Sequence, residues 1–510
     1  MGNSPSGAPA NAAAALSQPA QAGRFDEDEL VLLRRAFAKG DAGGLSRAQF
    51  GTAFGAMLPT GAIDRLFARM ARGEGPLARV PWCAWVDGLA AWKPASGAHL
   101  NPGLANAARL GVLWELMASA DAQPDPRVLE LDKAALESSD ELEDRALDEP
   151  SLFALLVCCA RHCSDAQGIG GASALEPVVA DALLVGSLSR AAWVRWACAC
   201  VPRLGEVAEL LVMRGVAVLA AASLPSARSM RVAEERWMPR LVGLSGSEEA
   251  ESPSLVLTPA LTWAISLAVP QPSNGSPIDE WRLLYTSAEQ GLSMNRWRAV
   301  LVGYGGPSLV VVSMSNGVSW AAYVDTPWTP SEAGRFFGSE DCALFALAPR
   351  FHAFPATKYS GNYCSFVQNV KAIGNPAARG QAGVEELVGF GGAASRYRAS
   401  LTEDLTRAIF RHSCSTYATD TARMDLAGMA REEDEHRVTT LEFFGLGGEA
   451  ADSALRNSRL QSEKGRARAG RVNRAAFGET WQDSPDKMLM ELGGKTFHSD
   501  NLRQPEHGAA

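Results

Sequence analysis

The chain has 510 residues, of which 47% are hydrophobic and 21% are charged, so it can bury large cores and is long enough for two to four domains. Its net charge of −9 gives no overall positive field, and we expect no nucleic-acid partner. The nine cysteines are scattered and odd in number, which is typical of free thiols in a reducing cytosol. The most apolar stretch, residues 207–224, is interrupted by Glu209 and Arg214 and is only a borderline membrane span.

The first residues, "MGNSPS", match the N-myristoylation pattern, with Gly2 exposed after removal of Met1 and Ser6 at the hydroxyl position. We predict a disordered arm over residues 1–24 with Gly2 as the acceptor of the lipid. The alternative, a chance match in an ordinary disordered start, stays open. One myristoyl chain gives only reversible membrane binding. Because the next basic residue is Arg24 and no cysteine precedes Cys83, a second attachment must come from a membrane-resident partner.

Residues 25–95 resemble a pair of EF-hands. Apolar spacing predicts helices at 25–37, 47–57 and 63–72, and a fourth helix with Trp82, Trp85 and Leu89. A calcium loop needs oxygen ligands at positions 1, 3, 5 and 12. With Leu45 and Val80 at the apolar position of each loop, the ligand positions are Ala38, Gly40, Ala42 and Gln49, then Gly73, Gly75, Leu77 and Ala84. No carboxylate remains, so we predict a degenerate, structural pair without calcium.

The middle of the chain reads as helical over residues 105–235, with two helices separated near Pro202. A Gly/Ser/Glu-rich stretch follows, and we predict a linker at 236–254. Beyond residue 280 the pattern changes to strands. Asn316-Gly317 between two β-rich runs predicts a hairpin with a type I′ turn. Further strands are expected in "CALFALAP", "YCSFVQ", "RYRASL" and "RVTTLEFFGL", which together favour an antiparallel sheet or sandwich with short helices.

Candidate chemistry is weak. "MELGGKTF" lacks the first glycine of a P-loop, where Leu489 stands. The glycines of "VGFGGA" (388–393) are better explained by tight turns or close approach of strands. Cys158, Cys159 and Cys163 with His162 lack zinc-ligand spacing and read as core residues. A Cys–His pair among His352, His412 and Cys414 is neither supported nor excluded. We therefore predict no catalytic residue, metal or cofactor.

The tail over residues 449–510 is basic, and Ser484-Pro485 and Gly493 predict a short helix between them. Its Met488, Leu489 and Leu492 form a short apolar face, which either packs on the protein's own surface or fills a partner's groove.

Several runs of the β region resemble the TLDc domain family over residues 255–448. They are "WRLLYTSAEQGLSMNRW", "GVSWAAYVDTPW", "FFGSEDCALFALAP", "YSGNYCSF", "GFGGAASRYRASLTEDL", "CSTY" and "VTTLEFFGL". The "MGNS" start, the EF-hand-like pair, "WVRWACACVPRLGEVAELL" and "DSPDKMLMELGG" are similar to the mTOR-associated and plant-type EF-hand/TLD members of that family. The whole chain is then an α+β multidomain protein: an all-α EF-hand-like and helical region, a TLDc β-sandwich with short helices, and a C-terminal helix.

The resemblance implies a non-catalytic adaptor that binds the vacuolar-type proton ATPase. It implies a cytoplasmic protein, peripheral on lysosomal or vacuolar membranes, with links to an mTOR-related complex and to oxidative-stress resistance. It also implies that the C-terminal helix docks into the pump, a role that would fall on Met488, Leu489 and Leu492 here. The alternative function is a redox-protective enzyme that uses a TLDc thiol, Cys414 or another cysteine.

Overall fold

The computed structural model describes residues 19–40, 44–55, 57–72, 78–93, 102–118, 145–163, 172–183, 188–220, 238–244, 254–270, 280–331, 335–367, 386–393, 396–402, 404–411, 413–419, 433–448, 452–453 and 456. The chain divides into two compact units, residues 1–452 and 453–510, and the account below concerns the first. The predicted lipid acceptor Gly2 and the predicted tail residues Met488, Leu489 and Leu492 lie outside the described residues. Among the described helices, none has the length and apolar character needed to cross a bilayer.

Four helices form the EF-hand-like region, as the spacing of apolar residues predicts: α1 (Glu27–Phe37), α2 (Arg47–Phe54), α3 (Thr60–Met70) and α4 (Trp82–Ala90). The first two begin with capping boxes, in which Asp26 pairs with Glu29 and Ser46 pairs with Gln49. The ring of Phe50 contacts those of Phe54, Phe67 and Trp85, and Phe54 also contacts Trp85, which makes one small aromatic core.

In the described part of the middle of the chain, five further α-helices are present: α5 (Pro102–Met117), α7 (Glu149–Cys163), α8 (Glu176–Ala182), α9 (Arg190–Cys200) and α10 (Leu204–Ala220). The break between α9 and α10 falls at Pro202, as predicted. Helix α10 packs against α1, α2, α5 and α7. Most side chains of α10 are therefore buried, which explains the hydrophobic run that begins at Val207.

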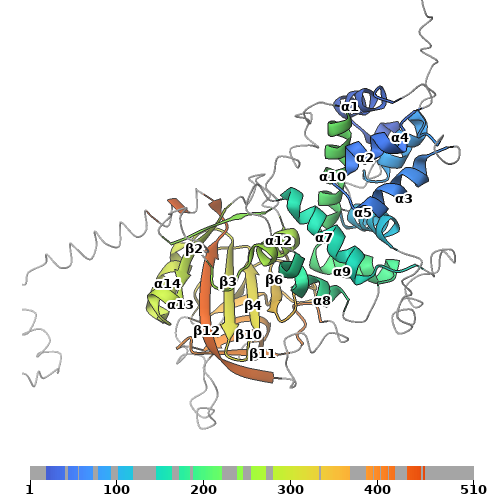
Figure 1. Cartoon of the computed structure of the whole chain (residues 1–510). Helices are drawn as coiled ribbons and strands as arrows, with labels where there is room; N and C mark the ends of the chain where they lie inside the picture. Colours follow the sequence, from blue (N-terminus) through green and yellow to red (C-terminus); the bar gives the residue numbers. More distant parts are fainter. Residues whose placement is uncertain are drawn as a thin grey trace, which may run out of the picture. The chain divides into compact units, whose positions relative to one another are not determined.

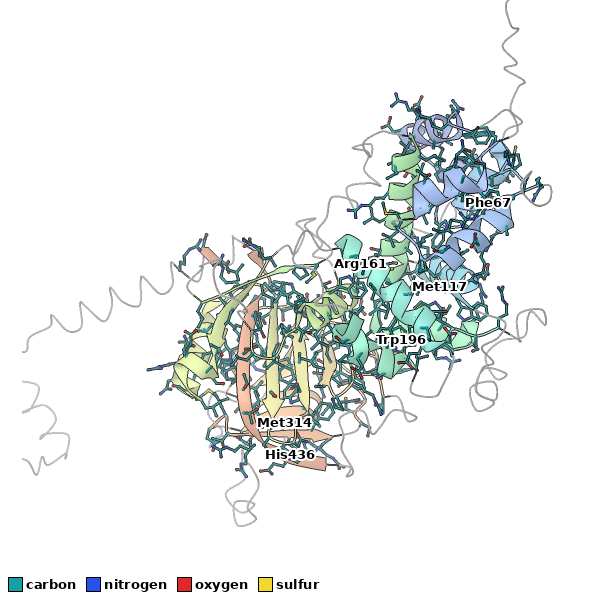
Figure 2. The ribbon with its side chains drawn as sticks, in the orientation of Figure 1. Phe67, Met117, Arg161, Trp196, Met314 and His436 are labelled. Carbon is teal, nitrogen blue, oxygen red and sulfur yellow. The ribbon has the colours of Figure 1, made fainter. Side chains whose placement is uncertain are left out.

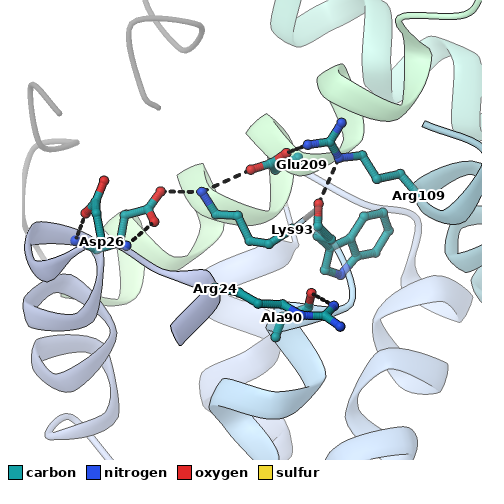
Figure 3. Close-up of polar contacts among 8 residues, drawn as sticks. Arg24, Asp26, Ala90, Lys93, Arg109 and Glu209 are labelled. Carbon is teal, nitrogen blue, oxygen red and sulfur yellow. Dashed lines mark hydrogen bonds and ion pairs between the residues drawn. The ribbon is translucent and has the colours of Figure 1, made fainter. Parts of the chain in front are cut away.

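A buried network of charges connects α1, α4 and α10 (Figure 3). Lys93, just beyond α4, pairs with Glu29 of α1 and with Glu209 of α10, the latter at 3.1 Å. Arg109 of α5 reaches the other oxygen of Glu209 at 2.5 Å and donates to the Trp92 carbonyl at 2.8 Å. Burial alone would lower the pKa of Lys93, but the two carboxylates outweigh burial and raise it. The ammonium is therefore charged inside the fold.

The predicted linker over 236–254 contains a strand. Residues Arg240–Val242 form β1, which runs parallel to β2 (Glu280–Thr286), and Arg240 also pairs with Glu280 across the two strands. Three residues are too few to show an alternation of apolar and polar side chains, so the sequence gives no sign of this strand.

Among the residues that the structure describes, the β region has ten more strands: β3 (Ser308–Met314), β4 (Ser319–Val324), β5 (Phe336–Phe337), β6 (Ala343–Ala348), β7 (His352–Pro355), β8 (Cys364–Phe366), β9 (Glu386–Ala393), β10 (Arg396–Thr402), β11 (Arg407–Arg411) and β12 (Glu433–Gly445). Their order is β5-β8-β9-β10-β11-β12-β3-β4-β6-β7, with β2 also beside β12, and every pair but β1–β2 is antiparallel. The four sequence runs predicted as strands each form one.

Strand β12 belongs to two sheets. Its first five residues pair with β11, and the residues from Val438 onward pair with β3, with a shift of register at the changeover. The Trp320 ring of β4 lies 5.9 Å from that of Phe390 in β9 and 6.4 Å from that of Phe410 in β11, so the two sheets pack face to face as a sandwich. Figure 2 shows Met314 and His436 at the same end of the sheet, where β3 and β12 meet.

The predicted hairpin at Asn316-Gly317 is present between β3 and β4, but its turn is not type I′. Only Gly317 has a positive φ there, +84°, and its N–H donates to the Met314 carbonyl at 3.0 Å. The side chain of Asn316 accepts a hydrogen bond from the Val318 N–H at 3.1 Å, which holds a three-residue connection instead.

Three short helices accompany the sheets: α12 (Pro259–Ala268), α13 (Ser287–Gln290) and α14 (Met294–Gly303). Helices α13 and α14 lie beside β2 (Figure 1), whereas α12 packs against α9 of the helical region. The Phe351 N–H before β7 donates to the Pro177 carbonyl of α8 at 3.0 Å. The β region therefore contacts α8 and α9 directly.

Candidate functional site

One corner of the β-sandwich brings Cys414 close to a glycine-rich strand. Gly391 of β9 allows this approach, because a Cβ there would meet the Tyr417 ring at 2.7 Å and the Cys414 sulfur at 3.0 Å, while Gly389 and Gly392 lie against Tyr397 and Arg396 of β10. Gly391 and Gly392 also have positive φ. Close approach of strands, as the sequence predicts, explains these glycines.

The half-buried thiol of Cys414 is held by its neighbours. The Tyr417 N–H donates to the Cys414 sulfur at 3.3 Å, and the Tyr417 hydroxyl donates to the Tyr363 carbonyl at 2.9 Å. Tyr417 is buried, and its two hydrogen bonds link the Cys414 sulfur to the loop that carries Tyr363.

A buried guanidinium lies beside this thiol. Arg398 of β10 is 2% exposed, and its Nη1 donates to the Ala418 carbonyl at 3.0 Å and to the Thr419 hydroxyl at 2.9 Å. Its guanidinium carbon lies 4.5 Å from the centre of the Phe354 ring. Burial lowers the pKa of Arg398, and the electrostatic attraction of the Cys414 sulfur opposes that change. The half-buried sulfur of Cys414 thus has a buried cation and a backbone N–H donor beside it.

A second group of side chains lies where α8 and α9 meet β7. We call Asp181, Cys200 and His352 the junction cluster. His352 Nδ1 lies 2.8 Å from Asp181 Oδ2 and 3.3 Å from Cys200 Sγ, and that sulfur is 4.0 Å from Asp181 Oδ2. Asp181 and Cys200 are fully buried and His352 is 5% exposed.

The electrostatics of the junction cluster favour a positive charge on the imidazole. Burial alone would lower the pKa of His352, but Cys200 and Asp181 outweigh it and raise this pKa to about 10. A catalytic triad would place the acid and the nucleophile on opposite ring nitrogens. Here both lie against Nδ1, and the sulfur is closed to solvent, so the arrangement does not suit nucleophilic catalysis.

The structure shows where several of the candidate catalytic and metal-binding residues lie. His352 lies against Cys200, so a Cys–His contact exists but involves a different cysteine from Cys414, and His412 lies outside the described residues. Cys159 and Cys163 are buried, and burial raises the pKa of both, to about 12 for Cys163. Such thiols are typical of unreactive core.

Sequence reasoning missed Asp181, Cys200 and Arg398 as members of these sites. His352 is 152 residues from Cys200 and 171 residues from Asp181, so no spacing rule brings them together. Arg398 lies in strand β10, where the alternation of side chains does not predict a buried charge. The one available signal is a basic residue within a run of residues expected to be buried.

Comparison with known proteins places the β region in a family. Residues 250–447 match the TLDc domain. A stretch of 230 residues, 44% of this chain, is 24% identical to MTOR-associated protein MEAK7 of Danio rerio and covers 42% of that protein. A stretch of 169 residues is 25% identical to Oxidation resistance protein 1 of Rattus norvegicus and of Homo sapiens, and covers 17% of each. The chain thus spans less than half the length of these relatives. The similarity to the TLDc domain covers residues 250–447, which is less than half of this chain.

Proposed function

We propose that this protein is a non-catalytic regulatory adaptor that binds the vacuolar-type proton ATPase and links it to an mTOR-related complex. The observation that carries the proposal is the match to MTOR-associated protein MEAK7. The matched stretch of 230 residues is longer than the TLDc domain at residues 250–447, so part of the similarity lies outside that domain. The matches to Oxidation resistance protein 1 are shorter than the domain.

One surface feature supports a role in partner binding. Tyr359, on the loop between β7 and β8, is 89% exposed, the most among the large hydrophobic side chains that the structure describes. The loop itself is held firmly: the Thr357 hydroxyl donates to the Ser415 carbonyl at 2.6 Å, and the Asn362 amide donates to the Gly392 carbonyl at 2.7 Å. A fixed, exposed tyrosine suits an anchor for a protein partner.

Membrane attachment in this proposal has two parts. A myristoyl chain on Gly2 supplies reversible binding to the cytoplasmic face of lysosomal or vacuolar membranes, and a pump-bound tail supplies the rest. Met488, Leu489 and Leu492 would form the apolar face of the docking helix in that tail. The resemblance of "DSPDKMLMELGG" to tails of the TLDc family supports this assignment.

The experiment is affinity capture of pump subunits by the tagged full-length chain from detergent extracts. We expect wild type and Gly2→Ala to capture the pump equally, and a chain lacking residues 484–497 to capture much less. Gly2→Ala should instead lose binding to membranes when fractions are separated without detergent. Tyr359→Ala should weaken capture, and Val302→Ala, a half-exposed apolar residue on α14, is its matched control.

The outcomes separate the parts of the proposal. Equal capture by the deleted chain would refute the docking helix, and equal capture by Tyr359→Ala would remove Tyr359 from the interface. Absence of pump subunits from the wild-type capture would refute the adaptor itself.

A second candidate function is protection against oxidants by Cys414, which the geometry at Arg398 favours. In that reaction the Cys414 thiolate attacks one oxygen of hydrogen peroxide, the O–O bond breaks, and sulfenic acid and hydroxide form. We expect Cys414→Ser to lose any peroxide consumption and Cys198→Ser, another half-buried thiol, to keep it. Full protection of cells by Cys414→Ser would exclude this function.

A further inference from the structure

The junction cluster has a property that neither the adaptor role nor the Cys414 reaction uses. A metal site needs several Cys, His, Asp or Glu side chains close together. Among the side chains that the structure describes, one group of three such residues has all its ligand atoms within 4.8 Å of one another: Asp181, Cys200 and His352. They come from three elements, α8, α9 and β7. Three different donors thus converge on one buried point.

We propose that the junction cluster is a zinc site, with Cys200 Sγ, His352 Nδ1 and Asp181 Oδ2 as ligands. Tetrahedral zinc with bonds of about 2.3 Å to sulfur and about 2.0–2.1 Å to nitrogen and oxygen separates its ligand atoms by about 3.2–3.6 Å. The three separations are 3.3, 2.8 and 4.0 Å. A small rotation of the Asp181 carboxylate away from the imidazole and toward the sulfur brings all three into that range.

The donor set matches the charge that zinc requires. A thiolate, a carboxylate and a neutral imidazole balance the two positive charges of the ion, so the buried site carries no net charge. Zinc, of borderline softness, accepts sulfur, nitrogen and oxygen together, whereas calcium and magnesium need oxygen alone.

Neighbouring residues hold the ligands in place. The Trp196 Nε1–H donates to Asp181 Oδ2 at 2.8 Å and keeps that carboxylate beside the imidazole (Trp196 is labelled in Figure 2). The His352 ring packs edge-on against Phe354, with 4.7 Å between ring centres. Ligands oriented in this way are a property of built metal sites.

The site would act as a clamp between the helical region and the β region. Two ligands lie on α8 and α9 and the third begins β7, so the metal would add bonds to a contact otherwise made by packing and by the Phe351–Pro177 hydrogen bond. Three protein ligands leave a fourth coordination position for water. Because every ligand is buried, the role is structural, and it is independent of pump binding and of Cys414.

The test is metal analysis of the full-length chain produced in zinc-supplemented medium. We expect one zinc ion per chain by inductively coupled plasma mass spectrometry, and an intense cobalt spectrum with a thiolate charge-transfer band after exchange with cobalt. Cys200→Ser and His352→Gln should lose the metal and the band. Cys198→Ser, two positions away on α9 and outside the cluster, should keep both.

Thermal unfolding keeps the proposal testable if a variant folds poorly. Zinc added after removal by a chelator should raise the melting temperature of the wild-type chain and of Cys198→Ser. Wild-type protein that neither contains nor takes up zinc, with no change in melting temperature, would overturn the proposal and leave a buried hydrogen-bonded ion pair. Zinc retained at full stoichiometry by a folded Cys200→Ser chain would overturn it as well.

Discussion

Leu45 and Val80 form an antiparallel bridge across the EF-hand-like pair, in which the Leu45 N–H donates to the Val80 carbonyl at 3.1 Å and the Val80 N–H donates back at 2.9 Å. These are the two residues that the sequence places at the same apolar position of each loop. The two loops are therefore joined through their backbones.

The first prediction is that the chain does not bind calcium. Gln49 occupies the place of the bidentate glutamate, and its amide is already used: its oxygen accepts from the Ser46 N–H at 2.7 Å and its nitrogen donates to the Lys39 carbonyl at 2.6 Å. Calorimetry with millimolar calcium should show no binding heat, and the melting temperature should not change. A saturable heat that disappears in Gln49→Ala would contradict this prediction.

The second prediction concerns the buried charges around Lys93. Lys93→Met leaves Glu29, which is buried, and Glu209 without their shared cation, and we expect a loss of about 3–5 kcal/mol of unfolding free energy. Arg69→Met breaks the more exposed pair with Glu115 and should cost below about 1 kcal/mol. Urea unfolding followed by tryptophan fluorescence measures both.

A double variant sharpens the Lys93 test. Because Glu29→Gln removes one of the stranded charges, Lys93→Met combined with it should cost less than the sum of the two single changes. If the single and double variants are strictly additive, or if Lys93→Met costs no more than Arg69→Met, the charges do not act as a buried network.

The sequence predicts most of the fold because its signals are local. Pro202 interrupts a helix whatever its tertiary surroundings, because proline lacks the backbone N–H. Alternating apolar and polar side chains around Leu441 and Phe443 indicate a strand. The prediction of a type I′ turn at Asn316-Gly317 is wrong, because the Val318 N–H donates to the Asn316 side chain and the Gly317 N–H donates to the Met314 carbonyl. Local sequence patterns predict helices and strands well, but they predict the hydrogen bonds of the connecting turns less well.

The candidate sites were far less predictable. Cys200 and Asp181 each read as ordinary members of an apolar helix, and His352 as an ordinary strand residue, because each gains its character only from the other two. The spacing of Cys and His residues along the chain predicts no metal site. Such spacing cannot reveal side chains that come together only when the chain folds. The raised pKa of His352, and the contact of both Asp181 and Cys200 with its Nδ1, can be recognised only from the folded structure.

The third prediction is a small pH dependence from Asp404, in the turn between β10 and β11. Hydrogen bonds from the hydroxyls of Thr402 and Thr406 lower the pKa of Asp404 to about 2. A folded pKa below the unfolded value gives stability that is present above about pH 4 and lost as the pH falls through 2. Since the carboxylate is largely exposed, Asp404→Asn should cost below about 1 kcal/mol at pH 7.

The measurement for Asp404 is the difference in melting temperature between wild type and Asp404→Asn from pH 7 down to pH 2. We expect this difference to be largest at neutral pH and to shrink below pH 4, because protonation removes the same charge from the wild type. A difference that stays constant or grows toward low pH would show that the carboxylate's charge does not stabilise this turn.

The fourth prediction concerns Gly389, which lies beneath the ring of Tyr397. A Cβ at this position would meet three ring carbons of Tyr397 at 2.1 to 2.3 Å, and Tyr397 is buried and cannot swing away. Gly389→Ala should therefore cost about 3 kcal/mol or more, or lower the yield of folded protein. Gly361→Ala is the matched control, since nothing lies within 4 Å of its Cβ and the change should stay within about 0.5 kcal/mol. Tyr397→Leu should make Gly389→Ala less costly than it is in the wild type, because a smaller side chain frees the space. Equal melting temperatures for the two alanine variants would show that the strands do not need this glycine for their close approach.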